Sequence, residues 1–495
     1  MIFAVVYKKI FIPMQIKLAA FAAGAILFVS SCTKPTPIPD TGNQVPSAGD
    51  IAVAVTVDPS QQVGQIPDAF TGLSFEKTTL INSSGYFGPY NIPLNNMVHA
   101  LGQGYLRAGG ASVNKVYFLN GIYPADSLSL IPYDQGQFIQ FAEANGWPMI
   151  YGVAGNPAQN GWVQPEVHYL AETYFSNSNT TFEVGNEPDL YSLNGMRPST
   201  YSYEDFKNEW SSTLVIVHEQ FADAPFEGPG TSSNTWVAAF ARDRHSSIKW
   251  LTEHYYKLGT GNDTTEGIQR LLDGNDEILS RVAILKAAAA PYDLPVRITE
   301  CNSVAGDKEG VSNTFASALW GLDFMFTLAQ HGVAGVNFHA GNAPSTPIAF
   351  LSGPAKPNPL YYGMLLFAQA TTGKKMLAVT STPQSPINLT AYATQQTNGV
   401  VKVTLINKDL SKEAFVTLSA INTNLSFELA SAMRLSAPSL SSTTDVLLGG
   451  SAVAADGTWS ASKTEDLVIT ANATTVKVPA GSAVEVTLYK VRSKA

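Results

Sequence analysis

The chain contains only two cysteines, Cys32 and Cys301, among 495 residues. A fold of this size must therefore be held together by a large hydrophobic core and not by disulfides. Charged residues are also scarce, at 14% of the chain, and acidic residues outnumber basic ones by 39 to 30. Because polyanions are bound by surplus lysine and arginine, the net charge of −9 argues against a nucleic-acid partner. The hydrophobic content of 45% indicates a globular protein, and the length suggests two or three domains.

Signatures of metal and cofactor sites are missing too. The seven histidines form no HExxH motif and no cluster with cysteine at zinc-binding spacing. The stretch "GQGYLRAGG" begins like a dinucleotide fingerprint, but Arg107 stands where the third glycine is required. We therefore expect no metal and no organic cofactor. His254 and His339, at strand ends, are interpreted as orienting residues, and Cys301 as a small buried hydrophobic residue.

The N-terminal segment has the pattern of an export signal. Three lysines precede the apolar run "LAAFAAGAILFVSSC", which is too short and too early for a stable membrane span. The ending "VSSC" resembles a bacterial lipobox, so residues 1–31 are predicted to be a lipoprotein signal peptide and Cys32 the lipid attachment site. The alternative is an ordinary signal peptide, with Cys32 discarded. The Pro-, Gly- and Ser-rich residues 32–50 are predicted to be a tether. The expected location is outside the cytoplasm, with contact to a bacterial membrane through the lipid only.

Residues 66–372 alternate short β-like runs with helical stretches. Eight such repeats predict an α/β fold, a closed (β/α)₈ barrel rather than an open doubly wound sheet. The expected strands lie at 70–76, 104–110, 148–155, 181–188, 224–230, 248–256, 296–303 and 332–341. Helical spacing of apolar residues is found in 133–146, 203–221, 276–290 and 312–332.

From residue 373 to 495 the pattern changes to a period of two with Ser, Thr and Asn turns. This period predicts half-buried antiparallel strands, and the length fits a β-sandwich. The early run "IAVAVTVD", within residues 51–65, has strand composition and is predicted to pair with this C-terminal sheet.

Two glutamates follow strands of the predicted barrel. Glu187 ends the fourth strand and Glu300 ends the seventh. Side chains at the C-terminal ends of barrel strands form the active site of such folds. Two carboxylates brought to one rim from non-adjacent strands can flank a glycosidic bond. Glu183 has the strand parity of Glu187 and is interpreted as a structural polar residue inside the barrel.

The motifs around these glutamates support a family resemblance. "EVGNEPD" and "ITECNSV", followed by "GVSNTFASALWGLDF" and "GVNFHAG", resemble glycoside hydrolase family 79, whose members include β-glucuronidases and heparanases. The resemblance implies that Glu187 is the acid/base and Glu300 the nucleophile. Such an enzyme retains the anomeric configuration, with its carboxyl groups about 5–5.5 Å apart.

The resemblance also implies residues that hold the sugar. Asn186 would bind the 2-hydroxyl, and Tyr255 or Tyr256 would hold the nucleophile. Glu76 would accept hydrogen bonds from hydroxyls on the far side of the ring. Alternatively, Glu76 pairs with Lys77 or Arg107, the tyrosines are packing residues, and Asn186 is a turn former.

Recognition of a C5 carboxylate is where the sequence departs from the family. Family members use backbone amides and tyrosines of the loops after strands seven and eight. Here Ala305 and Gly306 stand where tyrosine and glycine are common, and "HAGNAPSTPIAF" has no tyrosine. The backbone N–H groups of Gly306 and Asp307 remain as hydrogen-bond donors that could bind an anion.

Four functions stay open on these residues. The favoured one is an exo-acting β-glucuronidase that removes terminal glucuronic acid from a carbohydrate substrate. Heparanase-like endo-cleavage is disfavoured because the acidic balance promises no basic cleft. The others are a related barrel glycosidase for a neutral sugar and a non-catalytic carbohydrate-binding lipoprotein. Linkage and oligomeric state are not indicated.

Overall fold

A computed structural model describes residues 49–81, 86–121, 125–174, 180–259, 261, 264–341, 343–350, 353–422 and 427–490. The predicted signal peptide, Cys32 and nearly all of the tether lie outside the described residues. Thr41–Ala495 form one compact unit. Among the described helices, none combines the length and hydropathy needed to cross a membrane.

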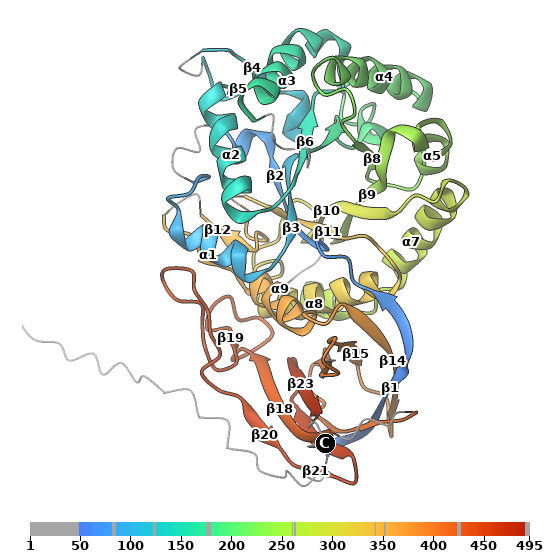
Figure 1. The fold of residues 1–495 in the computed structure, drawn as a ribbon, viewed down its shortest axis with the longest axis vertical. Coiled ribbons are helices and arrows are strands. Elements are labelled where there is room, and N and C mark those ends of the chain that lie inside the picture. The colour runs from blue at the N-terminus through green and yellow to red at the C-terminus, as the bar shows by residue number, and fades with distance from the viewer. Residues whose placement is uncertain are drawn as a thin grey trace, which may run out of the picture. The chain divides into compact units, whose positions relative to one another are not determined.

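The predicted barrel is present. Eight parallel strands close in the order β10, β11, β2, β3, β6, β7, β8, β9, and Figure 1 shows helices arranged around them. Each strand coincides with one of the eight runs expected from the sequence. Their bounds are β2 (Thr71–Glu76), β3 (Gly104–Gly109), β6 (Met149–Val153), β7 (Thr181–Val184), β8 (Phe226–Thr231), β9 (Ile248–Leu258), β10 (Val296–Val304) and β11 (Val336–Ala340).

The helices begin and end where local sequence signals place them. Ser202 and Asp205 form a capping box at the start of α4, and Gly146 ends α2 in the left-handed conformation. The α-helices are α1 (Ile92–Ala100), α2 (Pro132–Asn145), α3 (Asn160–Tyr174), α4 (Tyr203–Gln220), α5 (Val237–Arg244), α6 (Thr264–Leu272), α7 (Asp276–Ala289), α8 (Phe315–Gln330) and α9 (Pro359–Ala370). Short connecting elements are η1 (Lys77–Thr79), η2 (Ala111–Asn114), β4 (Tyr117–Phe118), β5 (Ser129–Leu130), η3 (Pro157–Gln159), η4 (Pro188–Leu190), η5 (His245–Ser247), η6 (Ala290–Tyr292), β12 (Ile348–Ala349) and β13 (Lys356–Pro357).

The C-terminal region forms a single curled sheet of eleven strands. Its path is β19, β18, β23, β16, β15, β14, β1, β17, β22, β21, with β20 paired to β18. Valines and other apolar side chains from both halves of the path enclose one core. The bounds are β14 (Lys375–Pro383), β15 (Leu389–Gln395), β16 (Val401–Asn407), β17 (Ala414–Ala420), β18 (Phe427–Ser436), β19 (Leu447–Leu448), β20 (Glu465–Leu467), β21 (Ile469–Thr470), β22 (Ala473–Val478) and β23 (Ser482–Lys490).

The early strand lies in this sheet, as the sequence led us to expect. β1 (Ile51–Gln65) pairs antiparallel with β14 and parallel with β17. Its alternate side chains Val53, Val55 and Val57 are buried in the core of the sheet, which is the period of two that the sequence shows. The chain then passes directly from β1 into the first strand of the barrel.

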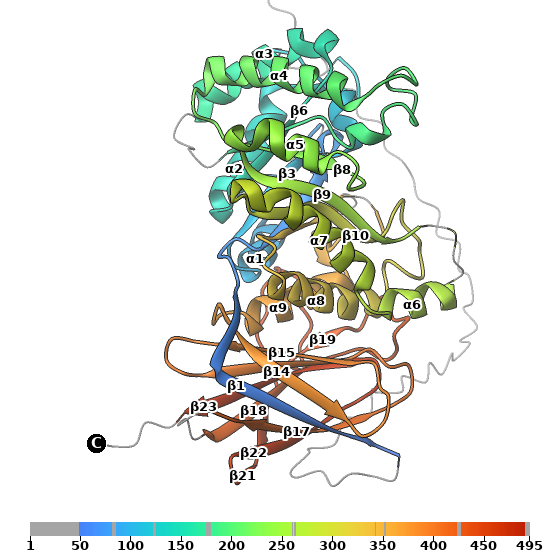
Figure 2. The same ribbon diagram turned by 90° about the vertical axis from the view of Figure 1, so that its right-hand side faces the viewer.

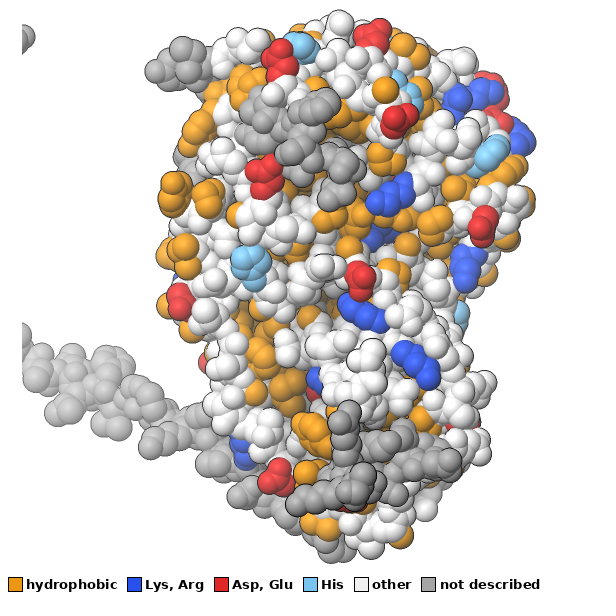
Figure 3. Space-filling model, viewed as in Figure 1, with side chains coloured by type: hydrophobic (Ala, Val, Ile, Leu, Met, Phe, Trp, Pro, Cys, Tyr) orange, Lys and Arg blue, Asp and Glu red, His pale blue; other side chains and the backbone are white. Residues whose placement is uncertain are grey.

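Helices α8 and α9 lie between the barrel and the sheet (Figure 2). A buried polar cluster joins α8 to the sheet: Asp323 forms an ion pair with Lys408 at 2.7 Å and accepts a hydrogen bond from the Tyr392 hydroxyl at 2.9 Å. Both charged side chains are 3% exposed. Because an isolated buried charge is costly, this pairing favours one seating of the sheet against α8. On the face drawn in Figure 3, acidic and basic side chains are interspersed.

Candidate active site

The turn that carries Glu187 is sharp and sterically specified. Gly185 has φ +74°, and a Cβ at this position would lie 2.2 Å from the Tyr191 hydroxyl. Glu187 itself has φ 47° and ψ 57°, a conformation that non-glycine residues adopt rarely and that is common at functional sites. Its N–H donates to the Gly230 carbonyl at 3.0 Å, which ties the turn to the end of β8. The backbone thus fixes the direction in which the Glu187 carboxyl points.

A second tie to the same loop comes from Asp189. Its carboxylate accepts hydrogen bonds from the Ser232 N–H at 3.1 Å, the Ser232 hydroxyl at 2.9 Å and the Ser233 hydroxyl at 2.9 Å. The residues after β7 and β8 are therefore held together on both sides of Glu187. Sequence reasoning assigned no role to Asp189, although it completes the "GNEPD" stretch.

Glu300 is buried and fully paired. Tyr256 donates its hydroxyl to Oε1 at 2.7 Å, and Arg107 Nη1 donates to Oε2 at 2.7 Å. Burial alone would raise the pKa of Glu300, but His339, His254 and Arg107 together with the Tyr256 hydrogen bond lower it well below its usual value. Glu300 is therefore ionised at neutral pH, as a nucleophile must be.

Arg107 organises the floor of the site. All five of its N–H groups are used: two bond Glu183, two bond Ser74 and Glu300, and one bonds Asn186 at 2.9 Å. The side chain is completely buried, so its contacts are with fixed groups and not with solvent. A charged residue within the apolar strand "GYLRAGG" was the available signal, but Arg107 was interpreted only as a break in a dinucleotide fingerprint and as a partner of Glu76.

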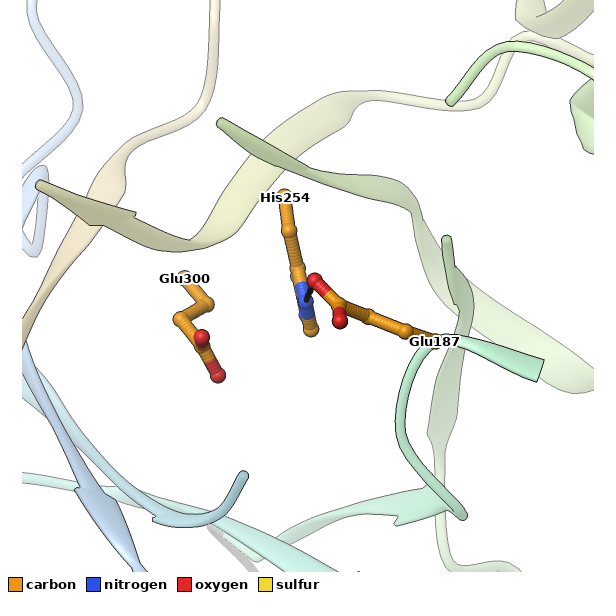
Figure 4. Close-up of side chains that lie close together, drawn as sticks. All are labelled: Glu187, His254 and Glu300. Carbon is orange, nitrogen blue, oxygen red and sulfur yellow. Dashed lines mark hydrogen bonds and ion pairs between the residues drawn. The ribbon is translucent and has the colours of Figure 1, made fainter. Parts of the chain in front are cut away.

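His254 lies between two carboxylates. Its Nδ1 is 3.2 Å from Glu187 Oε1, and its Nε2 is 3.7 Å from Glu183 Oε1. Figure 4 shows its ring meeting the Glu187 carboxyl, with Glu300 on the neighbouring strand. Burial would lower the pKa of His254, but Glu300, Glu183 and Glu187 raise it to about 10. The imidazole is therefore charged at neutral pH and orients Glu187, which supports the interpretation made from the sequence.

Glu227 is a further buried acid, which the sequence analysis missed. It faces Glu183 across the β7–β8 pair and accepts a hydrogen bond from the Thr252 hydroxyl. Burial, and then the charge of Glu183, raise the pKa of Glu227 to about 8. Glu227 is thus protonated at neutral pH. The ionised Glu183 and Glu300 are then matched by the positively charged Arg107 and His254.

The two central carboxylates are close. One ligand atom each from Glu187, His254 and Glu300 lies within 4.8 Å of the others. This proximity fits the short separation of retaining glycosidases and not the 6.5–9.5 Å of inverting ones. The same three atoms are spaced closely enough for a metal ion. However, Arg107 and Tyr256 already occupy the oxygens of Glu300, so this group does not fit a cation.

The tyrosine pair divides between two environments. Tyr256 reaches Glu300, whereas Tyr255 faces away from the barrel interior, stacks on Phe324 of α8 at 5.7 Å and lies 5.5 Å from Arg281. Neighbouring strand residues point to opposite faces, so only one of the two can contact the nucleophile. The suggestion that Tyr255 holds the nucleophile is therefore wrong, and its alternative, a packing role, is correct.

Glu76 pairs with neither of its suggested partners. Lys77 is buried against Glu166, and Arg107 is committed elsewhere. The Glu76 carboxylate instead accepts the N–H groups of Ala111 and Ser112 at 3.1 and 2.8 Å. Its side chain remains about one third exposed, so Glu76 is anchored by η2 and is still partly open to solvent. A contact with sugar hydroxyls stays a prediction.

Of the two backbone amides expected to bind an anion, that of Asp307 is used within its own loop. The Asp307 N–H donates to Val304 at 3.3 Å, which closes a turn. The Asp307 carboxylate accepts the Ser345 N–H at 2.9 Å, so it joins the loops after β10 and β11. The expectation that the Asp307 amide binds an anion is wrong, because a turn consumes that donor. Gly306 lies at the exposed tip of this turn.

Comparison with known proteins addresses the ancestry of this fold. Residues 391–484 match the family described as glycosyl hydrolase family 79 C-terminal beta domain. A curated β-glucuronidase from Aspergillus niger is 24% identical over 256 residues, which cover 46% of this chain and 47% of that protein. One from Neurospora crassa is 24% identical over 427 residues, which cover 72% and 75%. The chain thus spans about half the length of the first of these relatives and three quarters of the second.

Solved structures share the whole architecture. A 4-O-α-L-rhamnosyl-β-D-glucuronidase from Fusarium oxysporum aligns with a TM-score of 0.71 at 19% identity, over 88% of this chain and all of the other. A family 51 arabinofuranosidase from Xanthomonas axonopodis aligns with a TM-score of 0.65 at 17% identity, over 89% and 100%. At these identities the alignments establish a barrel with a C-terminal β domain as a common fold, and they leave the substrate to the site itself.

The charge on His254 makes stability depend on pH. Its pKa rises from an ordinary 6.5 to about 10 in the folded protein, so folding gains stability that is complete below about pH 6.5 and is lost as the pH rises through about 10. We expect thermal unfolding scans from pH 6 to 10 to show wild type and His254→Asn converging as the pH rises. The exposed His99→Asn serves as the control and should leave the pH dependence unchanged. A constant gap between wild type and His254→Asn would contradict the assignment.

Proposed function

We propose that the protein is a retaining, exo-acting β-glucuronidase that hydrolyses terminal glucuronic acid from oligosaccharides or glycoconjugates. The observation that carries the proposal is the pair Glu187 and Glu300: one carboxylate oxygen of each lies within 4.8 Å of the other, at the ends of the fourth and seventh barrel strands. Both relatives are named as β-glucuronidases, which supports the choice of sugar.

The two carboxyls have the unequal surroundings that double displacement needs. Ionised Glu300 attacks the anomeric carbon, while Glu187 gives a proton to the departing oxygen. Glu187 is 22% exposed, so a leaving group and then water can reach it. Once the sugar is esterified to Glu300, the negative charge of that carboxylate is lost, and Glu187 can take a proton from water. His254, at 3.2 Å, holds Glu187 in place and can exchange a proton with it.

The remaining contacts position the sugar. Asn186 is held by Arg107 through its Oδ1, which leaves its amide NH₂ available to donate to a 2-hydroxyl. Such contacts strengthen as the oxocarbenium-like transition state forms. Tyr256 keeps Glu300 oriented until the carboxylate attacks. Exo action is favoured over cleavage within a sulfated polymer because the chain is acidic, at a net charge of −9.

A panel of p-nitrophenyl β-glycosides tests the proposal. Glucuronide, glucoside, galactoside and xyloside are offered to the wild type and to the Glu187→Gln and Glu300→Gln variants. Turnover of the glucuronide that is lost in both variants, with proton NMR showing the β-anomer of the product first, is the expected result. An α-anomer as first product would exclude double displacement.

A neutral β-glycoside is the second candidate substrate. The observation in its favour is Asp307, whose own carboxylate takes the Ser345 N–H on the loop where an anionic substrate group would be bound. Glucoside or xyloside turnover without glucuronide turnover in the panel would select this candidate.

We also propose that Cys32 is lipidated and that the mature protein is anchored to a bacterial membrane. The support is the "VSSC" ending after a short apolar run, followed by a tether-like segment. Radiolabelled palmitate should be incorporated into the wild type but not into Cys32→Ser. Labelling of both would exclude this attachment site.

A further inference from the structure

His339 is the last inward-facing side chain of β11, and no catalytic role uses it. Its neighbour Phe338 packs outward on Trp320 and Phe324 of α8, so strand alternation directs His339 into the barrel. The His339 Nδ1 lies 3.3 Å from the Ser74 hydroxyl and 3.7 Å from Glu300 Oε2. Its Nε2 lies 3.7 Å from Glu76 Oε1. The imidazole therefore borders the nucleophile.

The barrel topology relates His339 to one part of the sugar. In the closed strand order, β11 and β7 are four steps apart in either direction, so they lie opposite each other. Asn186, which follows β7, is assigned to the 2-hydroxyl of the substrate. In a pyranose ring, C5 is diagonally opposite C2. A sugar with its 2-hydroxyl on Asn186 and its anomeric carbon at Glu300 consequently directs its C5 substituent toward β11.

Arg107 and His254, the positively charged side chains described above, are not free to meet a substrate. Arg107 is completely buried with all five N–H groups bonded. His254 is 1% exposed and lies between Glu183 and Glu187. His339 differs because its side chain is 18% exposed and its carboxylate neighbours lie beyond ordinary hydrogen-bonding distance. Imidazole can donate a charge-assisted hydrogen bond to a carboxylate.

We propose that His339 recognises the C5 carboxylate of the bound uronic acid, in the place of the tyrosines that this chain lacks. The inference rests on the proposed glucuronidase function and makes His339 the residue that selects a uronic acid over the corresponding neutral sugar. The Asp307 carboxylate joins the adjoining loops, and the Asp307 amide is bonded within its own turn, so neither group is a donor for the substrate carboxylate.

A matched pair of substrates isolates the carboxylate. p-Nitrophenyl β-D-glucuronide and its C6 methyl ester differ in one negative charge and share every hydroxyl. In His339→Gln, which removes the imidazole and keeps a hydrogen-bonding side chain, kcat/KM for the free acid should fall about 10- to 100-fold further than kcat/KM for the ester. Most of the difference should appear in KM. The control is Lys308→Gln, which removes a positive charge from the loop after β10. Thermal unfolding verifies that both variants fold.

The alternatives give different patterns. Equal losses on acid and ester would make His339 a positioning residue for Glu300 and overturn the proposal. A selective loss on the acid in Lys308→Gln but not in His339→Gln would transfer the role to Lys308. If the wild type cleaves a neutral glucoside in a Glu187-dependent manner but neither the glucuronide nor its ester, the glucuronidase function itself fails, and the inference fails with it.

Discussion

Replacing Glu300 with glutamine is expected to reduce kcat by at least about 10⁴-fold on every substrate that the protein turns over, because the bond to the anomeric carbon can no longer form. Arg107 and Tyr256 hold the Glu300 carboxylate in place, and a neutral amide at this position cannot act as the nucleophile. The measurement is single-turnover and steady-state hydrolysis of aryl glycosides with the same preparation. A loss of less than about tenfold would exclude Glu300 as the nucleophile.

The matched variant Glu187→Gln should behave differently as the leaving group changes. Because an acid assists poor leaving groups most, the loss in kcat/KM should be small for a dinitrophenyl glycoside and large for an alkyl or sugar aglycone. Glu300→Gln should show no such trend. Azide, which needs no general base, should accelerate Glu187→Gln with activated substrates and give a β-glycosyl azide. A loss that is uniform across leaving groups would remove the acid/base role from Glu187.

Removing the guanidinium of Arg107 should have the largest effect on stability. In Arg107→Met, Glu183 and Glu300 remain buried without their partner, and breaking a buried pair in this way costs about 3–5 kcal/mol. The free energy of unfolding, measured by guanidinium titration, should fall by that amount. Arg107→Lys should recover part of the stability but little of the activity, since one ammonium cannot bridge Glu183, Glu300 and Asn186 as the planar guanidinium does.

Two comparisons sharpen the Arg107 experiment. The exposed pair of Arg242 with Asp243 provides a surface control, and Arg242→Met should cost about 1 kcal/mol or less. Adding Glu183→Gln to Arg107→Met should restore part of the loss, because one of the stranded charges is then neutral. If the double variant is no more stable than the single one, the loss comes from packing and not from unpaired charge.

Strand positions and the central carboxylates could be predicted from the sequence because both depend on local patterns. Every barrel strand coincides with a β-like run of the sequence. Glu187 and Glu300 could be assigned to the site because they follow the fourth and seventh of these runs. The partner of Glu300 could be narrowed to Tyr255 or Tyr256. The choice between them depends on the strand register, which shifts next to Glu300. The roles of Arg107 and His254 depend on contacts between residues 67 to 193 positions apart, which no local pattern encodes.

The loop chemistry was also beyond sequence reasoning, for a different reason. Whether the Asp307 amide is available depends on a single turn hydrogen bond to Val304, and its carboxylate pairs with a residue 38 positions away. The raised pKa of Glu227 likewise results from burial beside Glu183, and a lone glutamate in "APFEGPG" gives no sign of it. Such details require coordinates.

The position of β1 has a consequence for biosynthesis. Its antiparallel partner β14 begins at Lys375, about 310 residues after β1 ends at Gln65. At roughly 5–20 residues per second, a ribosome needs roughly 15–60 s to supply that partner. During this interval β1 has two unpaired edges and a row of valines, which is the kind of segment that invites aggregation. The barrel is, in effect, an insertion within the β domain, and the β domain cannot be completed until almost the whole chain has been made.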